Sequence, residues 1–173
     1  MNLLGKGGFS EVWRAFDLTS LSHVAVKVHQ LSPHWSEAKK QSYIKHATRE
    51  YQIHKIMRHP KVVSLLDVFE INHDSFATVL EYCPGTDLEQ KLKLRKVMPE
   101  KIAKALLLQV VCGLQYLNTP QAGHQGIIHY DLKPANILFD ENDDVKITDF
   151  GLSKIMESNN EGTSMELTSQ GAG

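Results

Sequence analysis

The dipeptide Pro84-Gly85 separates two stretches of this 173-residue chain that differ in their hydrophobic periodicity. Before it, short apolar runs alternate with turn residues and predict an antiparallel sheet of five strands, within residues 3–28, 62–69 and 76–82. A charged segment over 35–58, ended by His59-Pro60, predicts one main helix. After the break, residues 87–96 and 99–117 predict helices. The pattern indicates an α+β chain of two lobes with a cleft between them.

The bulk composition limits the classes of partner. Hydrophobic residues make up 42% of the chain and the formal net charge is -1, so no basic field favours nucleic acid or a membrane surface as the main ligand. Cys83 and Cys112 show no CxxC spacing, which predicts a reducing, intracellular compartment. The first residues lack the features of a signal peptide, and Lys104 and Gln109 interrupt the most apolar stretch, so we expect no membrane span.

A glycine-rich segment near the start predicts a phosphate-binding hairpin. Gly5 and Gly7 stand in a glycine pattern in which Ser10 occupies the third position. Alone, the pattern is better explained as an ordinary glycine-rich β-turn. A dinucleotide fingerprint would need a helix next, and a Walker loop would end in Gly-Lys-Ser or Gly-Lys-Thr, whereas a strand follows here. The remaining interpretation is a hairpin whose backbone N–H groups approach the phosphates of ATP.

A lysine in the third predicted strand is a candidate ligand of those phosphates. Lys27 lies between Val26 and Val28, and a strand lysine in isolation is most often a solvated surface residue. A lysine that contacts phosphates needs an anionic partner to hold it. Glu50 on the following helix is the best-placed carboxylate, while Glu37 lies too early in the helix to face the cleft.

Residues 129–136 and 149–151 carry the candidate catalytic groups. Asp131 is predicted to accept the proton of a substrate hydroxyl, and Lys133 to steady the transferred phosphate. Asn136 follows Asp131 by five residues, so one loop can direct both side chains into one cleft. Asp149 lies thirteen residues further, across a predicted hairpin, and would complete a Mg²⁺ site with Asn136.

Other polar clusters have simpler interpretations. Residues 140–144 resemble the start of a calcium loop, with four acids and Asn142, but Val145 occupies the position where such a loop requires glycine, so a solvated hairpin turn is expected. The nine histidines show no HExxH spacing. His54 and His129 are predicted to be packed core residues.

Four motifs in one order resemble the protein kinase signature: Gly5-Lys6-Gly7-Gly8-Phe9-Ser10-Glu11-Val12, Val24-Ala25-Val26-Lys27, His129-Tyr130-Asp131-Leu132-Lys133-Pro134-Ala135-Asn136 and Asp149-Phe150-Gly151. The chain is most similar to the Tousled-like kinases, on its His-Tyr-Asp form and on Leu4 to Val12, Ile147 to Met156 and Met165 to Gly173. The Lys133-Pro134 pair is the serine/threonine version of the loop. The resemblance implies ATP and Mg²⁺ as cofactors and protein Ser/Thr hydroxyls as acceptors.

The resemblance also assigns the nucleotide contacts. It makes Leu80 the gatekeeper and residues 81–83 the hinge, whose backbone would bond adenine. The implied ATP contacts are Leu4, Gly5, Lys6, Gly7, Gly8, Phe9, Ser10, Val12, Ala25, Lys27, Leu80, Glu81, Cys83 and Leu138. Of these, Val12, Ala25 and Leu138 would sandwich the adenine ring.

The resemblance divides the chain into an N-lobe, residues 1–82, and a partial C-lobe, residues 83–173, that ends within the activation segment. The chain alone is therefore expected to be impaired as an enzyme. A nuclear protein acting on histone chaperones is implied, with oligomerisation through coiled coils outside this sequence. A non-catalytic nucleotide- or partner-binding module is the alternative, and a small-molecule kinase is a third possibility.

One position departs from the common kinase pattern. Tyr130 stands where most kinases have an arginine that pairs with an activation-loop phosphate. We therefore expect little dependence of activity on phosphorylation at Thr163, Ser164, Thr168 or Ser169.

Overall fold

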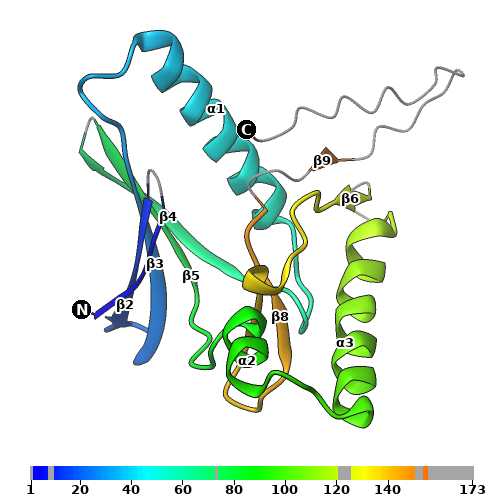
Figure 1. Ribbon diagram of the computed structural model, residues 1–173. Helices are drawn as coiled ribbons and strands as arrows, with labels where there is room; N and C mark the ends of the chain where they lie inside the picture. Colours follow the sequence, from blue (N-terminus) through cyan, green and yellow to red (C-terminus); the bar gives the residue numbers. More distant parts are fainter. Residues whose placement is uncertain (1, 8–9, 73, 121–125, 151–153, 156–173) are drawn as a thin grey trace, which may run out of the picture.

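A five-stranded antiparallel sheet forms the first half of the molecule (Figure 1). The computed structural model describes residues 2–7, 10–72, 74–120, 126–150 and 154–155. The strands follow the order β1-β2-β3-β5-β4, which confirms the predicted sheet. Their bounds are β1 Asn2–Lys6, β2 Ser10–Asp17, β3 Ser22–Gln30, β4 Leu65–Asn72 and β5 Ser75–Glu81. At the β2–β3 turn, the Asp17 carboxylate accepts from the backbone N–H of Thr19 at 2.9 Å.

One long helix, α1 (Glu37–Lys55), accompanies the sheet and packs against β4. Ser36 begins the helix, because its hydroxyl accepts from the backbone N–H of Lys39 at 3.3 Å. The helix ends at Lys55, before the expected bound at 58, and Ile56 is its C-cap. The predicted single helix is thus present and is shorter at both ends.

The fourth strand begins later than its apolar run predicted. Val62 and Val63 are buried, but they bond to strand β8 (Val145–Ile147) instead of joining β4. The N–H of Val63 donates to Ile147 O at 2.9 Å, and the N–H of Ile147 donates to Lys61 O at 2.9 Å. This short parallel bridge links the first half of the chain to the second.

Helices and short strands form the rest of the described chain. Helix α2 (Leu88–Arg95) is capped by Asp87, whose carboxylate accepts from Gln90 N at 2.8 Å, and α3 (Glu100–Asn118) follows Pro99. The short elements are β6 Ile127–Ile128, the 3-10 turn η1 Pro134–Asn136, β7 Ile137–Phe139, β8 Val145–Ile147 and β9 Lys154–Ile155. Within the described ranges, none of the helices has the length and apolar character needed to cross a bilayer.

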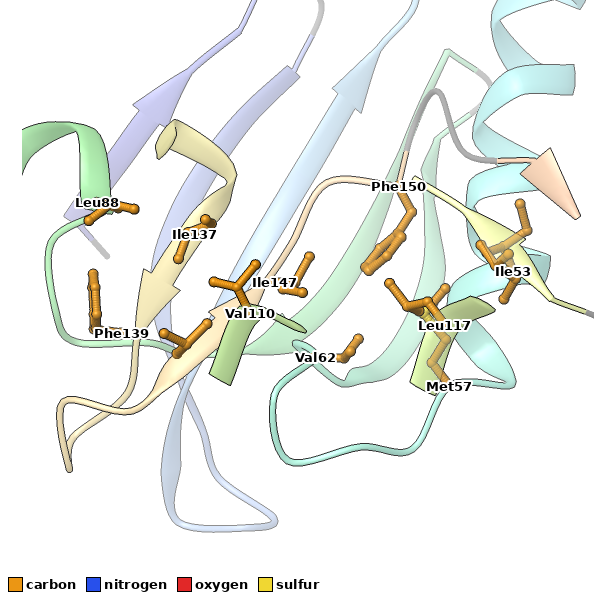
Figure 2. Packing of buried hydrophobic residues seen from close by; sticks show 12 residues of the cluster. Ile53, Met57, Val62, Leu88, Val110, Leu117, Ile137, Phe139, Ile147 and Phe150 are labelled. Atoms are coloured by element: carbon orange, nitrogen blue, oxygen red, sulfur yellow. The ribbon is translucent and has the colours of Figure 1, made fainter. Parts of the chain in front are cut away.

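A single apolar cluster joins the two halves (Figure 2). Ile53 and Met57, at the end of α1, pack with Leu117 of α3 and with Phe150, and all four are at most 1% exposed. The cluster continues through Val110 to Leu88 and the β7–β8 hairpin. Burial of this size is the main force that fixes where the end of α1 lies relative to residue 150.

Candidate active site

Lys27 lies between two carboxylates from distant parts of the chain. Its Nζ is 3.0 Å from Glu50 Oε1 on α1 and 4.0 Å from Asp149 Oδ1 beyond β8. The Lys27 and Glu50 side chains are both less than one-fifth exposed, so their attraction is less screened than that of a surface pair. The predicted contact between Lys27 and Glu50 is therefore present, and Asp149 lies beside it.

The alternative partner, Glu37, lies elsewhere. It occupies the first turn of α1, its side chain is 79% exposed, and it pairs with Lys40 at 3.6 Å. Glu50 lies thirteen positions after Glu37, near the buried end of the helix.

The loop from Asp131 to Asn136 is closed on itself by side-chain bonds. The Asn136 amide nitrogen donates to Asp131 O at 2.8 Å and to Asp131 Oδ2 at 3.1 Å. Lys133 Nζ donates to the same Oδ2 at 2.8 Å. This bond raises the pKa of the Lys133 amine; partial desolvation of the amine opposes the rise, and the negative charge of Asp131 adds to it. Both contacts thus hold one carboxylate oxygen of Asp131, and Oδ1 is the oxygen available to a substrate.

Backbone bonds bring Asp149 to this loop. The N–H of Thr148 donates to Asn136 O at 3.1 Å, and Thr148 O lies 2.9 Å from His129 Nε2. Because His129 Nδ1 accepts from the N–H of Asp131 at 3.3 Å, the neutral ring must carry its proton on Nε2 and donate it to Thr148 O. His129 is 4% exposed, which confirms its predicted place in the core.

The donor set fits a divalent metal. The nitrogen of the Asn136 amide is used by Asp131, which directs its oxygen toward other ligands. Asp149 is a carboxylate one residue after Thr148, and its side chain is 45% exposed. An amide oxygen and a carboxylate are hard oxygen ligands of the kind that divalent cations such as Mg²⁺ prefer.

Two residues of the site have left-handed backbone conformations. Tyr130 has φ 61° and Asp149 has φ 65°, which is uncommon for residues other than glycine. Such conformations persist where surrounding contacts enforce them. Beside Asp149, the fully buried Phe150 ring lies between His54 and His129, at ring-centroid distances of 4.9 and 5.0 Å. His54 is also buried, as predicted.

Strand register places the expected adenine contacts on one face of the sheet. Val12 is opposite Lys27, and Ala25 is opposite Leu80, so these four side chains share a face. Leu138 lies on β7 beside Phe139, whose carbonyl accepts from the N–H of Gly85 after β5 at 3.1 Å.

The expected hinge contains an ion pair that the sequence did not indicate. Glu81 Oε1 is 2.5 Å from Nζ of Lys146 on β8, and Glu81 Oε2 accepts from the N–H of Ser64 at 3.1 Å. Lys146 is 9% exposed. Burial, with a further effect of the Glu81 charge, raises the pKa of the Cys83 thiol to about 12, so this thiol stays protonated.

The glycine-rich segment spans β1 and the start of β2. Leu4, Gly5 and Lys6 belong to β1 and are exposed, and the N–H of Gly7 donates to Ser10 O at 2.7 Å. Gly8 and Phe9 lie outside the described residues, as do the positions from 156 onward that entered the family resemblance.

Comparison with known proteins identifies the family. A family model described as "Protein kinase domain" matches residues 1–170. The chain is 57% identical over its whole length to the Arabidopsis thaliana protein named "Serine/threonine-protein kinase TOUSLED", 55% to the human "Serine/threonine-protein kinase tousled-like 2" and 51% to the Caenorhabditis elegans "Serine/threonine-protein kinase tousled-like 1". It spans 25%, 23% and 18% of those proteins, respectively. With the geometry of Lys27, Glu50, Asp131 and Asp149, these matches show that the chain belongs to the protein kinase domain family, whose members use ATP and a divalent metal.

Proposed function

We propose that this chain supplies the nucleotide site and the catalytic loop of a serine/threonine protein kinase, which transfers the γ-phosphate of ATP to protein hydroxyls. The observation that carries the proposal is the placement of Lys27 between Glu50 and Asp149, with Asp149 linked through Thr148 to the loop of Asp131. A lysine held by a helix carboxylate beside a metal-binding carboxylate is the arrangement that phosphoryl transfer requires.

Each side chain has a role that follows from its contacts. Lys27, oriented by Glu50, would neutralise the α- and β-phosphates. Asp131 Oδ1 would accept the proton of the attacking hydroxyl, while Lys133 would stabilise charge on the transferred group. Asn136 and Asp149 would hold Mg²⁺, which would bridge the phosphate oxygens and reduce the developing charge.

We also propose that residues 1–82 form the N-lobe of the kinase and residues 83–173 a part of its C-lobe. The sheet and α1 precede Glu81, and the helices begin at Leu88, which supports a boundary near the hinge. The nucleotide would lie between the face of β2, β3 and β5 and the loops after β6 and β8.

The rival function is a non-catalytic module that binds nucleotide or a partner. The bonds of Asp131 to Lys133 and Asn136 favour catalysis over this rival, because nucleotide binding alone has no need of a proton acceptor. The serine/threonine form of the loop, with Lys133 and Pro134, favours protein hydroxyls over small-molecule acceptors.

Titration of the chain with ATP, with and without Mg²⁺, tests the nucleotide site. We expect Mg²⁺-dependent binding that is lost in Lys27→Ala and Asp149→Ala. A matched control is Lys93→Ala, which removes a lysine from an exposed pair with Glu89 on α2 and should bind like the wild type. Equal binding by all four proteins would refute the proposed site.

The resemblance supports a finer proposal for the protein that contains this chain. We propose that it acts in the nucleus on histone chaperones and assembles through coiled coils outside this sequence. Phosphorylation of purified histone chaperones, compared with a generic basic protein, would test the substrate class. Faster phosphorylation of the generic protein would contradict it.

A further inference from the structure

A second link between β3 and α1 runs beside the Lys27–Glu50 pair. His29 Nδ1 lies 2.8 Å from the hydroxyl oxygen of Tyr43, within hydrogen-bonding distance. His29 is two residues after Lys27 on β3, and residues two apart lie on the same face of a strand. Tyr43 is seven residues before Glu50, which places the two on the same side of a helix, two turns apart. The two links are therefore parallel connections from one strand face to one helix face.

The strand end of this link is held rigidly. His29 is 4% exposed, and its ring is stacked on that of Phe76, directly opposite on β5, at a centroid distance of 4.4 Å and an interplanar angle of 5°. At the helix end, Tyr43 also contacts the ring of Trp35 at 5.5 Å.

Both partners stay uncharged over the physiological range. Burial, and then the positive charge of Lys27, lowers the pKa of His29 to about 3. Burial, and then the negative charge of Glu50, raises the pKa of Tyr43 to about 12. The bond therefore joins two neutral groups.

The two ends of α1 are fixed by different contacts. Near its end, Ile53 and His54 are buried, and Met57 just beyond the helix is also in the core. In the first half of the helix most described side chains are exposed, whereas Tyr43 is partly buried. Glu50 lies between the two anchors. With a rise of about 1.5 Å per residue, Glu50 lies about 4.5 Å from Ile53 along the helix axis, and Tyr43 lies about 15 Å from it. If α1 pivots at Ile53, a displacement at Tyr43 therefore moves Glu50 by about one-third as much.

We propose that His29 and Tyr43 are positioning residues that set the angle of α1, and thereby hold Glu50 at the distance from Lys27 that phosphoryl transfer needs. This inference rests on the proposed kinase function. Neither residue touches the nucleotide or the acceptor. Removing the hydroxyl of Tyr43 would leave α1 folded and anchored at its buried end, with the Lys40–Asp74 ion pair at 3.8 Å still joining its first half to the β4–β5 turn. The first half of α1 would then be held less firmly, and the distance from Lys27 to Glu50 would lengthen.

The test uses Tyr43→Phe, which deletes only the hydroxyl. Tyr51→Phe is the matched control, because it makes the same change on the same helix, at a ring over which the Lys55 ammonium lies, 5.5 Å from the ring centroid. Hydrogen exchange of the α1 amides should be faster over residues 37–47 in Tyr43→Phe and unchanged in Tyr51→Phe. Unchanged exchange in Tyr43→Phe would overturn the inference, whatever the activity.

Kinetics of the natural protein that contains this chain provide the functional test. Tyr43→Phe should lower kcat about fivefold, as expected for loss of one hydrogen bond, with little change in KM for the peptide substrate. In a Glu50→Gln background, the same substitution should cause less than about a 1.5-fold further loss, since it acts through Glu50. A fivefold loss in both backgrounds would indicate general destabilisation and overturn the positioning role.

Failure of the proposed function has a different outcome. If the wild type and Lys27→Ala transfer no phosphate and bind MgATP equally weakly, the kinase assignment of this chain fails and the positioning role fails with it. If Lys27→Ala is inactive while Tyr43→Phe has wild-type kcat, the kinase assignment stands and only the inference about His29 and Tyr43 is refuted.

Discussion

Acidification should destabilise this protein through His29, because the folded state buries the ring as the neutral form. The groups around the ring are the Tyr43 hydroxyl on α1, the Phe76 ring on β5 and the Lys27 ammonium on its own strand. None is an acid that would stabilise an imidazolium near neutral pH. We therefore expect the protein to lose stability when the pH is lowered from 8 to 5.

The size of the effect follows from the two pKa values of His29. The pKa is near 6.5 in the unfolded chain and is lowered to about 3 by burial in the folded one. The unfolded state then binds more protons, so stability falls as the pH drops below about 6.5 and continues to fall to about 3. Relative to pH 8, the loss is about 0.8 kcal/mol at pH 6 and about 2 kcal/mol at pH 5.

Urea unfolding followed by tryptophan fluorescence measures this loss, since Trp35 lies beside Tyr43. Other histidines contribute to the total, and the decisive quantity is the difference between wild type and His29→Gln at each pH. The free energy of unfolding of the wild type minus that of His29→Gln should fall by about 2 kcal/mol between pH 8 and pH 5. Ile53→Val is a control for destabilisation without a change in titrating groups. If the difference between wild type and His29→Gln stayed constant across this range, His29 would not be the source of the loss.

Two further substitutions test the packing near the hinge. Gly85→Ala should lower the free energy of unfolding in urea by about 1–3 kcal/mol, because the added Cβ would lie 2.8 Å from both Cβ and O of Phe139. Gly5→Ala is the control, since its added Cβ has no atom within 4 Å and should not clash. Equal loss in both would contradict the packing argument. Lys146→Met should lower the free energy of unfolding by about 2 kcal/mol, because the mostly buried Glu81 carboxylate loses its ion pair and keeps its hydrogen bond from the Ser64 N–H. Adding Glu81→Gln removes the unpaired charge and should recover at least half of that loss. No recovery in the double variant would show that Lys146 acts through packing alone.

The sequence predicted those features that depend on neighbours along the chain. Asp131, Lys133 and Asn136 lie within six residues, and one loop suffices to bring their side chains together. The helix start at Ser36 and the break at Pro84-Gly85 are also local signals. Glu50 could be chosen over Glu37 as the partner of Lys27 because Glu37 lies in the first turn of α1 and Glu50 lies near its end.

Contacts between distant segments were beyond prediction from periodicity. The Glu81–Lys146 pair joins residues 65 apart (146 − 81), and alternation alone gives no reason for a lysine on β8 to be buried. A signal for the His29–Tyr43 link did exist, because His29 shares a strand face with Lys27, but a histidine in a strand is equally compatible with a solvated edge. Val62 and Val63 were assigned to β4 for the same reason, since an apolar run does not specify which strand it pairs with.

The order of residues along the chain therefore specifies which acids, lysines and amide are present and on which type of element they lie. How these side chains are held depends on packing between distant segments. Phe150 fits between two histidine rings only when the end of α1, the end of α3 and the β7–β8 hairpin share one core. That packing sets the depth of α1 and, through it, the reach of Glu50 to Lys27. Interactions of this kind depend on distances in space, to which the order of residues is only an indirect guide.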